Sequence, residues 1–302
     1  MLRRVWRVVA PLLMLPVLPA CGAAPPRGGV ISVVASIMPL ADWAQEVGGE
    51  RVSVQLLVPP GVNPRTYVPT EQQRRAVERA DVVVLNGLGL EPWLVAILEE
   101  TRNSRLVVLE IAQFTGPLTE RVTRRYRPLP PDPDIGPGTR QRAGTELSVP
   151  APVYSSYLWL DPTSAMHQVE LIAYTLARVD KPGLSYYRQN AARYNGEIEN
   201  LDASVFRQSD SWIERTVLVS NRFLYPFARR YNLALVLLSD PARRTEAAQA
   251  PLVLDRLVSM TADTRTLGAD TPVLEVNPLA GATYIELIQT NVHSMTLVLA
   301  DQ

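Results

Sequence analysis

The segment VISVVASIMPLADWAQEVGG, residues 30–49, joins a near-continuous apolar run to an amphipathic run, which indicates a buried strand followed by a helix. Further along, the apolar runs VSVQLLV, DVVVLN and RLVVLEI alternate with two more helical patterns. Strands that are apolar without alternation are typical of parallel sheets covered on both faces. The pattern therefore predicts an α/β fold built from βαβ units.

A long helix in the middle of the chain predicts two lobes. The pattern from Leu184 to Ser209 keeps an apolar stripe at helical spacing and would extend roughly 40 Å at about 1.5 Å per residue. Because domains commonly hold roughly 100 to 200 residues, a chain of 302 residues is expected to form two of them. We therefore expect α/β lobes with parallel-type sheets at residues 30–180 and 211–302, joined by a rigid linking helix at 181–210.

The second lobe has fewer clear strands than the first. TVLVS, ALVLLSD and PVLEVNP predict strands, and TYIELIQTNVHSMTLVL predicts the closing helix. The stretch around Leu252 to Met260 is interpreted as helical. This interpretation leaves the second sheet smaller than the first.

Residues 1–29 have the character of an export signal and a tether. The basic leader MLRRVWR precedes an apolar run that is short for a membrane span. The ending Leu18-Pro19-Ala20-Cys21 resembles a bacterial lipobox, which predicts cleavage before Cys21 and acylation of its sulfur. The alternative is an ordinary secretory signal with a chance cysteine. We expect an exported, extracytoplasmic protein that is anchored to the membrane by a lipid at Cys21, and a single cysteine allows no intramolecular disulfide.

Composition argues against several functional classes. Thirty basic and thirty acidic residues balance, so no global field attracts a polyanion, and we expect no nucleic-acid partner. Residues 115–153 are dense in Pro, Gly and Arg and are predicted to form an inserted loop. The sequence contains no glycine-rich phosphate loop and no standard nucleophile motif.

Several motifs stand in a fixed order along the chain: SIMPLADWAQEVGG, LVPPGVNPRTYVPT, ADVVVLNGLGLEPWL, LWLDP, FLYPFARRYNL and TYIELIQTNV. This set resembles the solute-binding lipoproteins of zinc and manganese ABC importers. The resemblance covers nearly all of the chain after the signal, apart from 115–153 and a region near 245–270. It implies two α/β lobes joined by a rigid helix, a metal ion held between them, and an ABC permease and ATPase as partners.

The positions that match the metal ligands of that family carry other residue types here. The resemblance places ligands at Arg65, within VPPGVNPRTYVPT, and at Tyr157, just ahead of LWLDP, where the family has His. It places a His or Glu ligand at Ser220 and an Asp ligand at Asn277. The segment between ALVLLSD and VNPLA is interpreted as shortened, without the additional strand and helix of the relatives.

Arginine at position 65 conflicts with metal binding. Arg offers no lone pair, Ser and Asn are weak neutral donors, and Tyr binds metals well only when deprotonated. Two unit charges about 4 Å apart interact by about 4 kcal/mol at an effective dielectric of about 20, so Arg65 would oppose a dication by roughly twice that. We therefore expect no metal cofactor and an altered, non-functional metal site, with zinc or manganese as cargo only if the family activity is retained.

Three functions stay open at this point. The first is metal delivery by an importer component despite its altered site. The second is the binding of a small anionic or polar ligand by the four substituted side chains, because guanidinium and hydroxyl donors converge well on carboxylate or phosphate. The third is a ligand-free adaptor or adhesion-type lipoprotein, in which Arg65 fills the cleft by pairing with Glu275 or Asp161.

An enzymatic function is not expected. Asp161 and Glu275 could form a carboxylate pair and Ser220 could act as a nucleophile, but no His or Lys is placed to act as a base. Asp161 is more simply interpreted as a helix N-cap. The two histidines, His167 and His293, lie off the apolar stripes of their helices and are predicted to face solvent.

Overall fold

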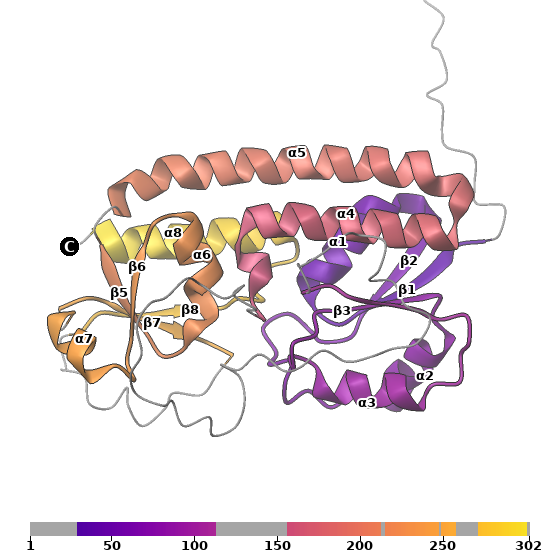
Figure 1. Ribbon diagram of the computed structural model, residues 1–302, viewed down its shortest axis with the longest axis horizontal. Helices are drawn as coiled ribbons and strands as arrows, with labels where there is room; N and C mark the ends of the chain where they lie inside the picture. The colour runs from indigo at the N-terminus through magenta and orange to yellow at the C-terminus, as the bar shows by residue number, and fades with distance from the viewer. Residues whose placement is uncertain (1–28, 113–155, 213–214, 248, 258–270, 301–302) are drawn as a thin grey trace, which may run out of the picture.

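The structure, a computed structural model, describes residues 29–112, 156–212, 215–247, 249–257 and 271–300 (Figure 1). Residues 1–28, which hold Cys21 and most of the predicted export segment, and the predicted insertion at 115–153 lie outside the described residues. In the part of the chain that is described, no helix combines the length and the apolar character needed to cross a bilayer.

The first lobe is built on four parallel strands in the order β2-β1-β3-β4. Val33 of β1 pairs with Val54 on one side and with Val82 on the other. Successive residues of β1 face opposite layers, since Val33 packs with α1 and α4 whereas Val34 packs with α2 and α3. The elements are β1 (Ile31–Ala35), α1 (Met38–Gly48), β2 (Val52–Leu56), α2 (Glu71–Arg79), β3 (Val82–Leu85), α3 (Pro92–Glu100), β4 (Val107–Glu110) and α4 (Pro162–Val179).

The second lobe repeats this arrangement with four parallel strands in the order β6-β5-β7-β8. Its elements are β5 (Thr216–Val219), α6 (Tyr225–Arg230), β6 (Ala234–Leu237), α7 (Pro241–Glu246), β7 (Leu252–Asp255), β8 (Val273–Val276) and α8 (Tyr284–Ala300). Short 3-10 turns complete the chain: Gly49–Arg51, Leu158–Leu160, Lys181–Gly183, Asp210–Trp212 and Arg222–Leu224.

One element differs from the sequence-based prediction. Leu252–Asp255, expected to begin a helix, forms strand β7 in the middle of the second sheet, and the rest of that predicted helix from residue 258 onward lies outside the described residues. A short apolar run fits a buried helix turn and a buried strand equally well. The segment between β6 and β8, which was predicted to lack a further strand, therefore contains one.

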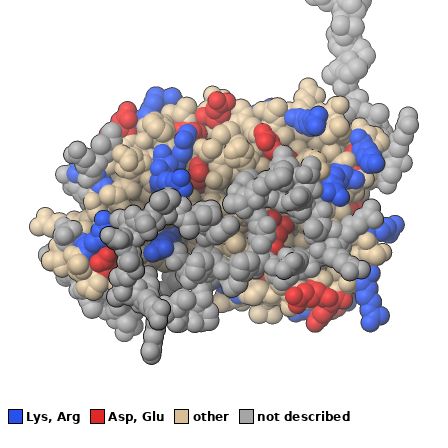
Figure 2. Space-filling view, viewed as in Figure 1, with Lys and Arg blue, Asp and Glu red and all other residues tan. Residues whose placement is uncertain are grey.

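The long helix α5 (Leu184–Ser209) packs along α4 and continues to α8 of the second lobe (Figure 1). The side chains that it buries recur at helical spacing: Tyr187, Ala191, Tyr194, Ile198, Leu201 and Val205. The predicted fold class is thus confirmed, with two parallel-sheet α/β lobes and a long helix between them. On the face shown in Figure 2, acidic and basic side chains are interspersed, which matches the balanced composition.

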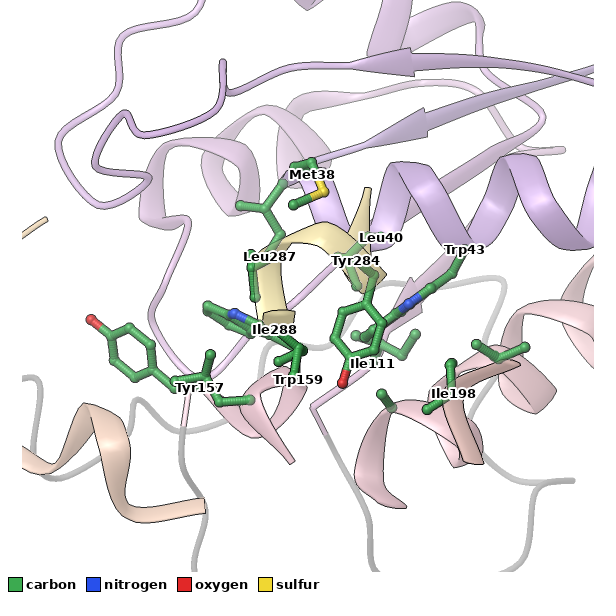
Figure 3. Packing of buried hydrophobic residues seen from close by; sticks show 14 of the residues in the cluster. Met38, Leu40, Trp43, Ile111, Tyr157, Trp159, Ile198, Tyr284, Leu287 and Ile288 are labelled. Carbon is green, nitrogen blue, oxygen red and sulfur yellow. The ribbon is translucent and has the colours of Figure 1, made fainter. Parts of the chain in front are cut away.

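One cluster of buried apolar side chains runs through both lobes. Trp43 of α1 meets Tyr284 of α8 edge to face, with ring centroids 5.2 Å apart (Figure 3). Beside this pair, the Asp42 carboxylate accepts hydrogen bonds from the Tyr194 hydroxyl of α5 and from the backbone N–H of Tyr284, 3.1 Å away. The indole N–H of Trp159 donates to the carbonyl of Pro278 at 2.8 Å. These contacts hold the two lobes together, and those of Asp42 and Trp43 lie on the helical side of the molecule, which is formed by α1, α5 and α8.

Candidate binding site between the lobes

The loop that joins β2 to α2, residues 57–70, holds Arg65 in a defined position. The side chain of Asn63 accepts a hydrogen bond from the backbone N–H of Arg65 at 2.9 Å. The indole of Trp93 donates to the carbonyl of Pro64 at 2.7 Å. The loop ends at Thr70, whose side chain caps α2 in a capping box with Gln73. Local bonds therefore hold the backbone of the loop in place around residue 65.

The guanidinium of Arg65 lies against Tyr157. Its Nη2 is 3.5 Å from the Tyr157 hydroxyl, and its central carbon is 5.9 Å from the centroid of the ring. The distance to the hydroxyl is at the long end for a hydrogen bond, and the position over the ring is favourable for a cation–π contact. The structure therefore brings together the two residues that the sequence placed at the first two ligand positions.

Tyr157 links this loop to the second lobe. Its hydroxyl donates to Oδ2 of Asp255 at 2.8 Å, and its ring packs against Trp159 and Phe223. Figure 3 shows Tyr157 next to Trp159 at the end of the buried cluster. Burial and the neighbouring charge of Asp255 raise the pKa of Tyr157 well above its usual range. The phenol is thus a neutral donor rather than a phenolate ligand.

Asp255 is an acidic residue of this site that was not predicted from the sequence. It ends β7 and is 1% exposed. Burial raises the pKa of Asp255. Hydrogen bonds from Tyr157, the Leu257 N–H and the Asn221 side chain oppose this rise, as does the positive charge of Arg65. The available signal was an Asp directly after the apolar run LVL, at the carboxyl end of a strand.

A second buried carboxylate lies within electrostatic reach of Arg65. Glu91 accepts hydrogen bonds from the Ser36 hydroxyl and from the backbone N–H groups of Asn86 and Gly87, the latter two at 3.0 Å. Burial raises the pKa of Glu91, and these bonds together with the charge of Arg65 oppose that rise. Arg65 therefore interacts with one buried carboxylate from each lobe.

The residues at the other two predicted ligand positions, Ser220 and Asn277, have other roles in the structure. Ser220 follows β5 and is half-buried, and it is the next residue, Asn221, whose side chain reaches Asp255. Oδ1 of Asn277 accepts from the Leu279 N–H at 3.0 Å, so this side chain stabilises the turn after β8. Asn221 was not predicted as a site residue, because a shift of one residue after a strand changes which side chain points into the site.

The two charge partners suggested for Arg65 have other contacts. Asp161 caps α4 by accepting from the Thr163 N–H and the Ser164 hydroxyl, each at 2.9 Å. The Glu275 side chain is 57% exposed and lies 3.9 Å from Arg256. The carboxyl groups that interact electrostatically with Arg65 are instead those of Asp255 and Glu91.

The donor atoms of the site do not form a metal-binding cluster. Across the described ranges, no three His, Cys, Asp or Glu side chains come together in a group that could hold a metal ion. Both histidines, His167 and His293, are exposed on their helices, as predicted. What the site offers is the buried carboxyl groups of Asp255 and Glu91, a neutral phenol, an amide and a guanidinium.

Comparison with known proteins identifies relatives that bind metals. Residues 33–297 match the family model ZnuA, described as zinc-uptake complex component A, periplasmic. The manganese-binding lipoprotein MntA of Halalkalibacterium halodurans is 29% identical over 211 residues, 69% of this chain and 60% of that protein. The high-affinity zinc uptake system protein ZnuA of Bacillus subtilis is 22% identical over 235 residues, 76% of this chain and 68% of the relative.

Solved structures show the same fold. A zinc-bound deletion mutant of ZnuA superposes with a TM-score of 0.67 at 24% identity, covering 89% of this chain and 98% of that structure. The periplasmic zinc-binding protein TroA of Treponema pallidum gives a TM-score of 0.67 at 19% identity, covering 90% and 99%. At these identities the superpositions establish the arrangement of lobes and helix.

Proposed function

Since the chain belongs to the ZnuA family of periplasmic zinc-uptake components, we propose that it is the extracytoplasmic solute-binding component of an ABC importer, with a metal site altered so that it no longer holds zinc or manganese. The observation that carries this proposal is the guanidinium of Arg65, which lies against Tyr157 where the tyrosine bonds Asp255. Its partners would be a permease and an ATPase, and its anchor a lipid at Cys21.

The chemistry of the donors supports the loss of metal binding. Zinc in proteins is usually held by four nitrogen, thiolate or carboxylate donors. The Tyr157 hydroxyl bonds the carboxyl group of Asp255, and Tyr157 remains a neutral phenol. A dication about 4 Å from Arg65 would also meet a repulsion of roughly 8 kcal/mol at an effective dielectric of about 20.

The charge balance favours a filled cleft over an anion site as the primary interpretation. An incoming anion would approach a guanidinium whose charge already interacts with the carboxyl groups of Asp255 and Glu91. One observation supports the anion alternative: Nη1 of Arg65 is buried and has no hydrogen-bond partner among the described residues. That donor is available to a small carboxylate or phosphate, and thermal-shift measurements at low salt against a panel of such anions test this second function.

Titration calorimetry with zinc and with manganese tests the primary proposal on the metal-stripped mature protein. The expected result is no saturable binding with a Kd below about 1 µM for either metal. A double variant, His167→Ala with His293→Ala, serves as the matched control, because any weak zinc uptake by the two exposed imidazoles disappears in it. Tight binding that persists in this double variant would overturn the proposal.

A further inference from the structure

We propose that residues 57–70 form a strap that holds the two lobes closed in the absence of any solute, with Arg65 taking the place of the cation that would otherwise bridge them. This inference rests on the proposed loss of metal binding and adds a conformational consequence to it. The strap belongs to the first lobe, and its contacts reach the ends of two strands in the second.

Three contacts join the strap to the second lobe. The backbone N–H of Gly61 donates to the carbonyl of Leu279 at 3.2 Å. The side chain of Asn63 donates to the carbonyl of Leu257 at 2.8 Å. The third is the chain from Arg65 through the Tyr157 hydroxyl to Asp255, with spacings of 3.5 Å and 2.8 Å. Two of these contacts therefore end at the carboxyl end of β7, at Asp255 and Leu257.

The backbone conformation of the strap and its close approach to the second lobe both favour glycine at position 61. Gly61 has a φ of +76°, a left-handed conformation that side chains disfavour. A Cβ at this position would lie 3.1 Å from the amide nitrogen of Asn277, on the second lobe. The strap is thus fitted against the second lobe by its backbone as well as by its side chains.

The strap is also stiff and firmly attached to the first lobe. Four prolines, at positions 59, 60, 64 and 69, restrict its backbone. Gln73 of α2 donates to the carbonyl of Leu57 at 2.8 Å, and Tyr67 packs edge to face on Trp93. A loop preorganised in this way loses little conformational entropy when it docks, which favours the closed arrangement.

Arg65 adds an electrostatic interaction between the lobes to these hydrogen bonds. Its positive charge acts on the carboxyl group of Asp255 on the opposite lobe, and its own side chain bonds the Tyr157 hydroxyl that donates to Asp255. On the helical side, Asp42 and the pair Trp43–Tyr284 keep the lobes in contact independently of the strap. Opening would therefore separate the lobes at the strap and leave the helical side in place.

Hydrogen exchange measured by mass spectrometry on the full mature protein tests the strap. The variants are Arg65→Gln, which removes the charge, and Tyr157→Phe, which removes only the bridging hydroxyl. In each we expect exchange in peptides covering residues 57–70 and 249–257 to become faster by roughly fivefold, with peptides from β1 and β3 unchanged. Arg75→Gln is the matched control, since Arg75 is exposed and pairs with Glu71 one turn away.

The outcomes separate this inference from the proposed function. If both variants exchange like the wild type in the two peptides, the strap does not depend on Arg65 and the inference is wrong. The proposed function stands in that case as long as titration calorimetry detects no metal binding. Faster exchange throughout β1 and β3 in one variant would indicate global destabilisation, and the other variant then decides. If zinc or manganese slows exchange in the wild-type strap, the proposed function and the inference both fail.

Discussion

Arg65 dominates the electrostatics of the cleft, because its guanidinium is positively charged and offers no lone pair. It interacts with the buried carboxylates of Asp255 and Glu91 and contacts the neutral phenol of Tyr157. Each of these side chains would be costly to bury alone. Together they form a compensated polar group between the lobes, so one substitution at position 65 changes the whole set.

Replacing Arg65 by His is predicted to restore part of a metal site. The change removes a repulsive charge, adds an imidazole nitrogen and releases Asp255 to act as a ligand. We expect Arg65→His to bind zinc at least about tenfold more tightly than the wild type, measured by competition with a chromophoric chelator. Arg65→Gln removes the same charge without adding a ligand, so equal zinc affinity in the two variants would contradict the role assigned to the imidazole.

Only part of this site could be predicted from residues. Arg65 and Tyr157 stood in recognisable motifs, and the structure places them in contact. Asp255 and Glu91 did not stand out, because what makes them important is burial beside Arg65, which depends on strands that are distant in sequence. Asn221 follows the expected Ser220 by one position, and no pattern in the chain predicts which of these two adjacent side chains points into the site.

At the scale of elements, Asp42 connects three helices. Its carboxylate receives the Tyr194 hydroxyl of α5 and the first N–H of α8, so it stabilises a helix N-terminus as well as the contact between lobes. Asp42→Ala would leave both donors without their partner inside a largely buried space. We expect a loss of about 2 to 3 kcal/mol in the free energy of unfolding, measured in urea. A loss below about 0.5 kcal/mol would show that water replaces the carboxylate.

The same residue predicts a dependence on pH. Burial raises the pKa of Asp42 above its ordinary value of 3.8, with Glu46 and Glu197 acting in the same direction and the bonds from Tyr194 and Tyr284 against it. The folded state therefore binds a proton at Asp42 more tightly than the unfolded state does. Protonation of Asp42 stabilises the fold; this contribution is complete below pH 3.8 and is lost as the pH rises through the raised pKa.

Asp42→Asn isolates this titration, because the amide oxygen can accept the same two hydrogen bonds without a charge. Going from acid to neutral pH, we expect the stability of the wild type to fall relative to that of Asp42→Asn, in urea denaturation series recorded at matched ionic strength. A constant difference between the two proteins over that range would mean that Asp42 titrates as it does in the unfolded chain.

Across the whole molecule, the layered architecture followed from sequence because buried parallel strands leave continuous apolar runs, and the long helix followed from its unbroken stripe. Strand β7 did not follow, since Leu252–Asp255 is too short for its periodicity to separate strand from helix. The contact between the lobes could not be predicted from the sequence either, because Trp43 and Tyr284 lie far apart along the chain and only packing brings their ring centroids to 5.2 Å.

This shared packing predicts that the two lobes unfold together. The buried cluster extends from α1 through α5 to α8, so neither lobe keeps an intact apolar core on the helical side when the other is lost. We expect a single calorimetric transition whose van't Hoff and calorimetric enthalpies agree. Trp43→Ala, which removes a fully buried ring from the junction, should cost about 3 to 5 kcal/mol and lower the coupling between the lobes. Two resolved transitions in the wild type would show that the lobes are independent folding units and that the junction between them contributes little.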